Sequence, residues 1–352
     1  MSNFVHLHVH SHYSLLDGMS KIPDLIEKSS KLGMSALALT DHGNMFGIKE
    51  FLDEADKYNS GLKKSLKDLD EKIANAAPEE LAKLQADRVK IAALKQVKPI
   101  VGIEAYCARR TLYDKDKDCK YIDPETGRER SVDSSGYHLI LLAKNKQGYR
   151  NLCKLTSIAY IDGFYSRPRI DHNVLAKHSE GLICCSACLG GEIPQLIMQN
   201  DMEKAEQAVQ WFKGVFGDDY YIELQRHQTF KPGGDQTTFQ RQQQVNAVLI
   251  DLARRNGVKI IATNDVHFVE EEHGDSHDLL VCISTNKDFD DPSRMHYTKQ
   301  EWLKSPQQMA EIFADLPEAI ENTLEVAQKV ETYSIDSAPL MPEYENTAGI
   351  WL

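Results

Sequence analysis

The chain of 352 residues is long enough for one large domain with an appendage, or for two ordinary domains. Its 41% hydrophobic and 27% charged residues are typical of soluble globular proteins, and no apolar run approaches the ~20 residues of a membrane span, so we expect no membrane partner. The net charge of −12, from 41 Lys+Arg against 53 Asp+Glu, argues against broad charge-driven binding of nucleic acid, because phosphate contacts need a cationic surface.

Seven short apolar runs predict strands, and helical patterns lie between them. The expected strands are 4–9, 36–40, 99–106, 138–143, 181–187, 220–224 and 259–263, and the expected helices are 22–32, 49–58, 149–160, 202–216 and 240–256. Several strand runs are apolar throughout, which is typical of strands covered on both faces. Strand followed by helix predicts right-handed β–α–β units and a parallel sheet or barrel, and we favour a barrel-like closure of seven strands.

Two regions depart from this alternation. Residues 61–98 are highly charged, with apolar residues at 62, 66, 69 and 73 and with Pro78 dividing them, which predicts an inserted helical hairpin. We interpret it as a solvated elaboration of a loop, with a contact to DNA or a partner as the alternative. Residues 305–330 predict one amphipathic helix with a Ser cap and Pro in its first turn. We divide the chain into a barrel of residues 1–286 and a helical extension, 287–352, cut from something longer.

The N-terminus and the cysteines bear on the compartment. No basic region followed by an apolar stretch and a small-residue cleavage site marks the chain for export. Seven cysteines, an odd number scattered along the chain, favour reduced thiols over disulfides. We therefore expect a cytoplasmic protein.

The first twelve residues hold histidines at positions 6, 8, 10 and 12, of 13 in the whole chain. Side chains alternate along a strand, so His6, His8 and His10 are expected to point to one face. A single histidine on a strand is usually a structural hydrogen-bonding group. Three in register favour a metal site instead.

Further side chains that bind metals come at the ends of other predicted strands, where barrel enzymes build their active sites. Asp17 follows the first strand closely enough to reach the same rim, whereas His138 precedes its strand, so spacing supports His138 less well. The full candidate set is His8, His10, Asp17, Asp41, His42, Glu104, His138, Cys188, Asp265 and His267.

Ten such groups exceed the needs of one ion, since four ligands complete a zinc site and six an octahedral one, so two or three divalent ions fit. Imidazole, carboxylate and one thiolate favour zinc, manganese or iron over magnesium and calcium, which prefer oxygen ligands. A cluster of ions suits phosphoester hydrolysis, because one ion lowers the pKa of its water while another stabilises the leaving oxygen. The cations would also offset the negative charge locally.

Two other motifs give weaker signals. Cys185 and Cys188 form C-x-x-C, but the first lies inside a predicted strand and not at a helix start, which disfavours a thioredoxin-like role. In FYSRPRID, Arg167 and Arg169 stand beside two aromatic residues, and a surface turn and a role in binding the substrate phosphate stay equally open.

Eight stretches, taken in chain order, resemble the polymerase and histidinol phosphatase (PHP) domain family. They are HLHVHSHYSLLDG, LTDHGN, KPIVGIEAY, YHLILLAKN, GFYSRPRID, SACLGGE, YYIELQ and ATNDVHF. The likeness is greatest to the version at the N-terminus of bacterial DNA polymerase III alpha subunits, and it covers about residues 3–286. It implies a distorted, seven-stranded, TIM-like barrel with a trinuclear metal centre. The 61–98 insertion departs from the shorter forms of the family.

The resemblance implies a role for each candidate residue. One ion would be held by His8, His10, Glu104 and Asp265, a second by Glu104, His138 and Cys188, and a third by Asp17, His42 and His267. Asp41 would be a ligand or orient its neighbour, and His6 would support the ligands from behind. Of these residues we expect Asp17, His267 and Asp41 to matter most for catalysis.

Because every ligand position is filled, the resemblance implies an active 3′-to-5′ exonuclease that removes misincorporated nucleotides from a DNA primer terminus. Its partners would be the remainder of the polymerase alpha subunit and other replisome subunits. Two alternatives stay open: structural metals that brace the polymerase without catalysis, and a monoester phosphatase for a small metabolite. The polymerase's own catalytic aspartates are absent, so we do not expect this chain to synthesise DNA.

Overall fold

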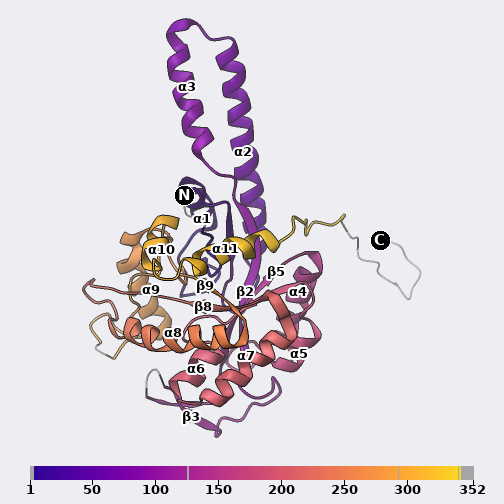
Figure 1. Cartoon of the computed structure of the whole chain (residues 1–352), viewed down its shortest axis with the longest axis vertical. Coiled ribbons are helices and arrows are strands. Elements are labelled where there is room, and N and C mark those ends of the chain that lie inside the picture. Colours follow the sequence, from indigo (N-terminus) through magenta and orange to yellow (C-terminus); the bar gives the residue numbers. More distant parts are fainter. Residues whose placement is uncertain (1–3, 125–126, 292, 340, 342–352) are drawn as a thin grey trace, which may run out of the picture.

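The computed structural model describes residues 4–124, 127–291, 293–339 and 341, so the end of the expected extension, 342–352, lies outside the described residues. A curled seven-stranded sheet forms the centre and helices cover it (Figure 1). The strands are, in spatial order, β1 (Ala36–Leu39), β2 (Lys98–Ala108), β5 (Gly136–Ala143), β7 (Leu182–Cys185), β8 (Tyr220–Leu224) and β9 (Lys259–Ala262), with β6 (Arg169–Ile170) paired to β2. A separate hairpin consists of β3 (Lys120–Ile122) and β4 (Glu129–Ser131).

The sheet is mixed, and the expectation of an all-parallel sheet is wrong at one strand. β1 and β2, β7 and β8, and β8 and β9 run parallel, but β5 is antiparallel to both β2 and β7. His138 near the start of β5 therefore pairs with Tyr106 near the end of β2. The first residues of β5 consequently lie at the rim where the neighbouring strands end.

The expected first strand, 4–9, is extended but forms no ladder, and the barrel is not closed. Val9 makes a single parallel bridge to Val266, and the segment donates from His10 N to Val266 O (2.7 Å) on one side. On the other side it accepts the Thr40 N–H at Val9 O (2.8 Å). The Val9 N–H, which a ladder would use, donates instead to Thr40 Oγ1 (2.9 Å). The segment thus bridges β1 and the chain after β9 without becoming a strand.

A bend at His8 interrupts side-chain alternation in this segment. Before the bend, Val5 and Leu7 pack in the cluster inside the curl of the sheet. After it, Val9 packs in the outer cluster beneath the helices, which turns His8 and His10 toward the inside. His6 precedes the bend and points elsewhere.

The strands bury alternate side chains in two layers. Leu37 and Leu39 of β1 pack outward against the helices, whereas Ala36 and Ala38 face the inside of the curl. On β2 the inward positions include Ile100 and, four residues later in the same register, Glu104. The inner layer is therefore apolar at one end of the sheet and becomes polar at the other.

Four of the five expected helices outside the insertion are present as α1 (Ile22–Lys31), α4 (Lys146–Ile161), α7 (Met202–Phe216) and α8 (Thr237–Asn256). The sequence patterns missed α5 (His172–Lys177), α6 (Glu192–Met198), α9 (Gly274–Thr285) and two 3-10 turns, η1 (Gly217–Asp219) and η2 (Glu271–His273). Capping side chains mark several starts: Asn145 accepts from Gly148 N, Asp171 from Val174 N and Asp201 from Lys204 N. No helix of the described ranges is long and apolar enough to cross a bilayer.

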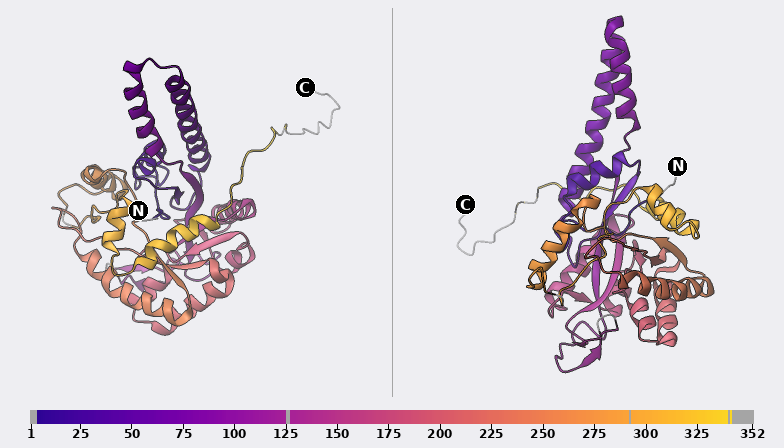
Figure 2. Two further views of the ribbon diagram at one scale, coloured as in Figure 1. Left: turned by 45° about the horizontal axis from the view of Figure 1, so that its top comes forward. Right: turned by 90° about the vertical axis from the view of Figure 1, so that its left-hand side faces the viewer.

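The expected insertion forms a helical hairpin that stands away from the body in both views of Figure 2. It consists of α2 (Ile48–Ala74) and α3 (Pro78–Ala93). The expected helix 49–58 and the first arm of the hairpin are one continuous helix, because a lone Gly61 costs only about 1 kcal/mol in a helix interior. α3 has no buried residue, as a solvated elaboration requires.

The expected helix 305–330 is two helices, α10 (Pro306–Ile312) and α11 (Pro317–Lys329). Pro317 cannot continue a helix, so it starts the second one. Ser305 caps α10 as predicted, in a capping box with Gln308. In α11, Val326 and Ala327 join the inner cluster of the sheet. The proposed division between residues 286 and 287 stays a prediction.

Candidate metal centre

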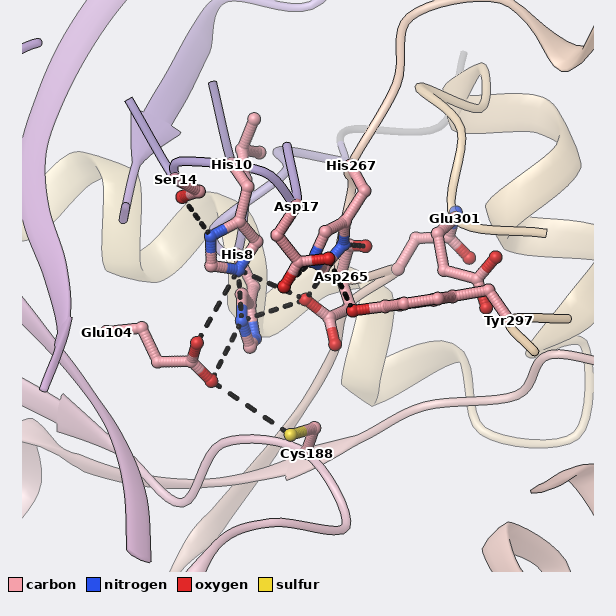
Figure 3. A network of polar contacts seen from close by, with 12 residues as sticks. His8, His10, Ser14, Asp17, Glu104, Cys188, Asp265, His267, Tyr297 and Glu301 are labelled. Carbon is pink, nitrogen blue, oxygen red and sulfur yellow. Dashed lines mark hydrogen bonds and ion pairs between the residues drawn. The ribbon is translucent and has the colours of Figure 1, made fainter. Parts of the chain in front are cut away.

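The polar end of the sheet's inner face brings the predicted ligands together (Figure 3). Three overlapping groups offer ligand atoms that lie within 4.8 Å of one another inside each group. They are His8, His10 and Asp265; His10, His42 and His267; and His42, Glu104 and His138. Because His10 and His42 each belong to two groups, the three groups form one continuous cluster.

The backbone turns sharply where several of these side chains enter the cluster. Asp265 has a φ of 46°, Leu16 before Asp17 has a φ of 58°, and Ala187 before Cys188 has a φ of 62°. Residues other than glycine rarely adopt the left-handed region, and such strain concentrates at functional sites. The chain therefore bends at the positions that present three of the predicted ligands.

His8, His10 and Asp265 form the inner part of the cluster. Asp265 Oδ1 lies 3.0 Å from His8 Nε2 and 3.2 Å from His10 Nε2, and the two imidazole nitrogens are 3.1 Å apart. Glu104 Oε1 is 3.4 Å from His8 Nε2. Each imidazole thus directs its Nε2 atom to the same small volume as two carboxylates.

Groups behind these two histidines set their orientation. Glu223 Oε1 lies 2.7 Å from His8 Nδ1 and accepts hydrogen bonds from Thr263 and Gln225 as well. An ionised carboxylate can only accept, so His8 is the donor, through its Nδ1 atom. Because His8 donates its Nδ1 proton to Glu223, the lone pair on its Nε2 atom stays free. A carboxylate in this position is the usual partner behind a metal-binding histidine.

Ser14 does the same for His10. Ser14 donates its one hydroxyl proton to Asp41 Oδ1 (2.7 Å), so its oxygen accepts from His10 Nδ1 at 2.9 Å. Asp41 also accepts from the backbone N–H (2.7 Å) and the hydroxyl (2.8 Å) of Ser11. The structure thus places Asp41 behind His10, with Ser14 bonded to both.

Glu104, His138 and Cys188 form a second part of the cluster. His138 Nδ1 lies 2.8 Å from Glu104 Oε1, and Cys188 Sγ lies 3.6 Å from His138 Nδ1 and 4.0 Å from Glu104 Oε1. Gly190 packs closely on the His138 ring, and a Cβ at Gly190 would be 3.1 Å from His138 Cγ. The backbone N–H of Gly190 donates to Cys188 Sγ (3.4 Å). This glycine lets the thiol and the imidazole approach one carboxylate.

Asp17, His42 and His267 form the third part. Asp17 Oδ2 is 3.0 Å from His42 Nε2 and 3.8 Å from His267 Nε2, while His42 Nδ1 contacts Glu104 Oε2. Tyr297 donates its hydroxyl to Asp17 Oδ1 (2.9 Å), and His277 Nε2 lies 3.9 Å from the same oxygen. Tyr297 and His277 both belong to the part of the chain that follows β9. They contact Asp17 although neither is one of the predicted ligands.

Burial and interleaved charges shift the pKa values of these groups in opposite directions. Burial raises the pKa of the Glu104 and Asp265 carboxyls, but the surrounding imidazoles outweigh it and hold both well below their usual range. Burial lowers the pKa of His8, but carboxylates led by Asp265 raise it well above its usual value. Burial lowers the pKa of His10 to about 3 and raises that of the Cys188 thiol. The buried carboxylates thus stay ionised and require cationic partners.

The residues fit a cluster of divalent ions. Four buried atoms, Glu104 Oε2, Asp265 Oδ1, His42 Nδ1 and His267 Nε2, have no hydrogen-bond partner among the described residues. His42 Nδ1 and Glu104 Oε2 also contact each other directly. Nitrogen, oxygen and one sulfur donor suit zinc, manganese or iron better than magnesium or calcium.

The cluster opens to solvent on one side. The side chains of His8 and Glu104 are 0% and 1% exposed, whereas those of Asp17 and His138 are 27% and 28% exposed. The inner side chains are therefore shielded from solvent, and a molecule from solution can reach the outer ones.

Three predicted residues are not among the side chains of the cluster. His6 is bonded through Nε2 to the Lys304 carbonyl (2.8 Å), on the other side of the bend at His8. Arg169 is fully buried, and among the described residues its guanidinium donates only to backbone carbonyls, such as Asp133 O at 2.7 Å, so the predicted role in binding the substrate phosphate is wrong for Arg169. Arg167 is exposed beside the cluster, with its guanidinium carbon 5.7 Å from the centre of the Tyr106 ring.

The sequence patterns missed several supporting residues: Glu223, Ser14, Tyr297 and His277. The sequence did contain a signal for Glu223, because it is the one carboxylate in the otherwise apolar run of strand β8. In the structure this side chain is buried in the sheet, where a carboxylate is rare unless it is paired. Ser14, Tyr297 and His277 have no spacing that points to the site, since their contacts depend on how distant segments fold together.

Comparison with known proteins adds independent information. A model of the PHP domain matches residues 6–227. DNA polymerase III subunit alpha of Borreliella burgdorferi is 42% identical over 100% of this chain and 26% of its own length, and that of Treponema pallidum is 38% identical over 97% and 24%. The chain thus spans about a quarter of the length of these relatives.

A solved structure of a candidate metal-dependent phosphoesterase from Bifidobacterium adolescentis is 12% identical. The match covers 75% of this chain and 87% of the other, with a TM-score of 0.34. A likeness that low carries no weight for the fold or the chemistry of this chain.

Proposed function

The chain belongs to the PHP domain family, and from this premise we propose that it is the PHP portion of a bacterial DNA polymerase III alpha subunit that hydrolyses phosphodiesters. The single observation that supports hydrolysis is the partly open cluster, in which His10 and His42 join three groups of ligand-type atoms into one. A site for one structural ion needs only four ligands and is normally closed, whereas this one has more ligands and an open side.

Two to three divalent ions, of zinc, manganese or iron, would polarise a phosphoryl oxygen of the substrate and lower the pKa of an attacking water. His8, His10, Glu104 and Asp265 would hold one ion, Glu104, His138 and Cys188 a second, and Asp17, His42 and His267 a third. Glu223 and Ser14 keep His8 and His10 in the tautomers that leave Nε2 free. The protein thereby fixes its ligands before substrate arrives.

The substrate in this proposal is the 3′ end of a DNA strand, and the reaction removes its terminal nucleotide. Asp17 and His267 are assigned as catalytic residues, because Asp17 is a ligand-type group on the open side and His267 faces it. Asp41 is assigned a positioning role through Ser14. The remainder of the alpha subunit would supply most of the cationic path for DNA that this acidic chain lacks.

The test uses the whole chain with manganese or zinc and a mismatched primer-template. Shortening of the primer should fall by roughly 100-fold or more in Asp17→Asn, the scale expected for a lost catalytic group. Asp68→Asn, an exposed carboxylate on the hairpin, is the matched control and should keep full activity. Primer that stays intact in the wild-type chain, while a generic monoester is cleaved or while metal only raises the melting temperature, would contradict the exonuclease assignment.

A further inference from the structure

Three exposed aromatic rings lie next to one another beside the metal centre and are not explained by metal binding. Phe46, Tyr160 and Phe164 are 61%, 41% and 49% exposed. The centres of the Phe46 and Tyr160 rings are 6.4 Å apart, and those of Tyr160 and Phe164 are 6.3 Å apart in a stacked pair. We call these three residues the aromatic ledge. Contiguous exposed apolar side chains mark interaction sites, and aromatic rings offer flat faces on which another ring can stack.

The ledge is tied to the metal centre through short contacts. Phe46 follows His42 by four residues, and Asn44 links the two by donating to His42 O (3.0 Å) and accepting from Phe46 N (3.0 Å). The Tyr106 ring borders the cluster, with its centre 6.4 Å from that of His42 and 5.3 Å from that of His138.

Gly43, Pro168 and the end of α4, the helix labelled in Figure 1, pack around the Tyr106 side chain. Gly43 has a φ of +63°, and a Cβ there would come within 3.0 Å of both Pro168 and the Tyr106 ring. Gly43, Tyr106, Pro168 and Ala159 of α4 line one small cavity. Phe46, Tyr160 and Phe164 thus project from three segments that pack together directly beside the ligands.

An unpaired cation completes the surface. Arg167 is exposed, three residues after Phe164, and no carboxylate in the described part of the chain forms an ion pair with it. Its guanidinium carbon lies 5.7 Å from the centre of the Tyr106 ring, which is itself 5.3 Å from that of His138. In a chain of net charge −12, a free guanidinium at the edge of the cluster is suited to a phosphate.

Stacking rings next to a phosphate-binding cation are the features by which proteins hold single-stranded nucleic acid without sequence preference. We propose that the aromatic ledge stacks unpaired bases of a nucleic acid strand while Arg167 binds a backbone phosphate, so that the strand end reaches the metal centre. This inference rests on the proposed function and names the substrate as a polynucleotide. A small monoester would fill the metal centre without touching the ledge.

The first test separates binding from hydrolysis. A fluorescent oligothymidylate is titrated with the whole chain in the presence of a chelator, so that catalysis cannot contribute to the signal. Phe46→Ala and Phe164→Ala should each weaken binding by roughly tenfold, the scale of one lost base stack. Phe230→Ala is the matched control, because Phe230 is 83% exposed and its substitution removes a ring far along the chain from the ledge.

The second test asks for stacking specifically. Phe164→Trp should retain binding and Phe164→Leu should lose it, since leucine keeps the apolar contact but not the flat face. Arg167→Gln should weaken binding and reduce its dependence on salt. Melting temperatures and metal content equal to those of the wild-type chain show that each variant is folded.

The third test distinguishes this inference from the proposed function. With metal added, the ledge variants should have a higher KM for the oligonucleotide but the same rate on bis(p-nitrophenyl) phosphate. A wild-type chain that cleaves neither substrate would overturn the proposed hydrolysis while the binding titration still judges the ledge. Oligothymidylate affinity that is absent in the wild-type chain, or equal in Phe46→Ala, Phe164→Ala and the control, would overturn the ledge as a nucleic acid site and leave it as a protein contact.

Discussion

At the scale of single residues, the metal centre depends on side chains that are not ligands. Glu223 is completely buried behind His8 and accepts three hydrogen bonds at one oxygen, from His8, Gln225 and Thr263. Its charge stabilises the Nδ1–H tautomer and strengthens His8 as a donor to a cation. A ligand set alone therefore understates what the chain must provide to bind metal.

Glu223→Gln tests this role. The amide keeps the size of the side chain but removes its charge and offers an N–H group that competes with His8 Nδ1–H, so we expect metal affinity to fall by roughly 10- to 100-fold. Metal retained after dialysis against graded chelator, measured by mass spectrometry, gives the affinity. Glu325→Gln is the control, because Glu325 accepts from the Tyr221 hydroxyl at the surface and touches no ligand. Equal metal retention in both variants would show that Glu223 does not tune the site.

Sequence reasoning named the side chains that the structure brings together, because they are chemically distinctive and follow strand ends. It left His138 doubtful because a parallel sheet was assumed, and the antiparallel direction of β5 is what brings its first residues to the rim. It placed His6 with His8 because regular alternation was assumed, and the bend at His8 breaks that alternation. Both differences arise from backbone direction, which local residue patterns do not encode.

At the scale of elements, strand and helix periodicity predicted most of the sheet and its covering helices. It predicted a strand over 4–9, where the N–H of Val9 donates to the Thr40 hydroxyl and that of Val5 to the Thr323 hydroxyl. Such side-chain partners come from distant parts of the chain, so the run of apolar residues gives no sign of them. The break between α10 and α11, in contrast, could have been predicted from the sequence. Pro317 has no backbone N–H to continue a helix, and the prediction of a single helix overlooked this.

The α2/α3 hairpin is an element that should be removable. Its base is closed by Asn59, which donates to Val97 O (2.9 Å) and accepts from Val97 N (2.9 Å). Beyond that point α2 buries no residue and α3 buries none. Replacing residues 62–94 by a short Gly-Ser linker should therefore change the free energy of unfolding by no more than about 1 kcal/mol.

Denaturant unfolding and metal content of the shortened chain check this expectation. Asn59→Ala in the shortened chain is the informative companion, because it removes both hydrogen bonds that close the base and should lower stability further. A shortened chain that loses its metals or unfolds without denaturant would show that the hairpin stabilises the rest of the protein. That result would contradict the expectation drawn from its solvent-exposed surface.

At the scale of the whole molecule, the metal centre and α11 occupy opposite ends of one inner layer. Val326 and Ala327 of α11 pack with Leu7, which directly precedes His8. The backbone ties the same parts, since Val5 N donates to Thr323 Oγ1 (3.0 Å) and Lys98 Nζ donates to Ala327 O (3.0 Å). These contacts favour a single cooperative unit that includes the segment 306–330, whatever lies beyond it in a longer chain.

Val326→Asp tests that unity. Val326 is fully buried, and an unpaired carboxylate in an apolar cluster costs several kcal/mol, so we expect a large fall in the melting temperature of the entire chain. Chelation of the wild-type chain should lower the same single transition, because saturating metal at about 100 times its Kd adds about 2.7 kcal/mol to the folded state. Val89→Asp, on the exposed face of α3, is the control and should leave the transition in place. Calorimetry decides the question: two transitions, of which only one responds to Val326→Asp and only the other to chelator, would mean that the barrel and the C-terminal helices unfold independently.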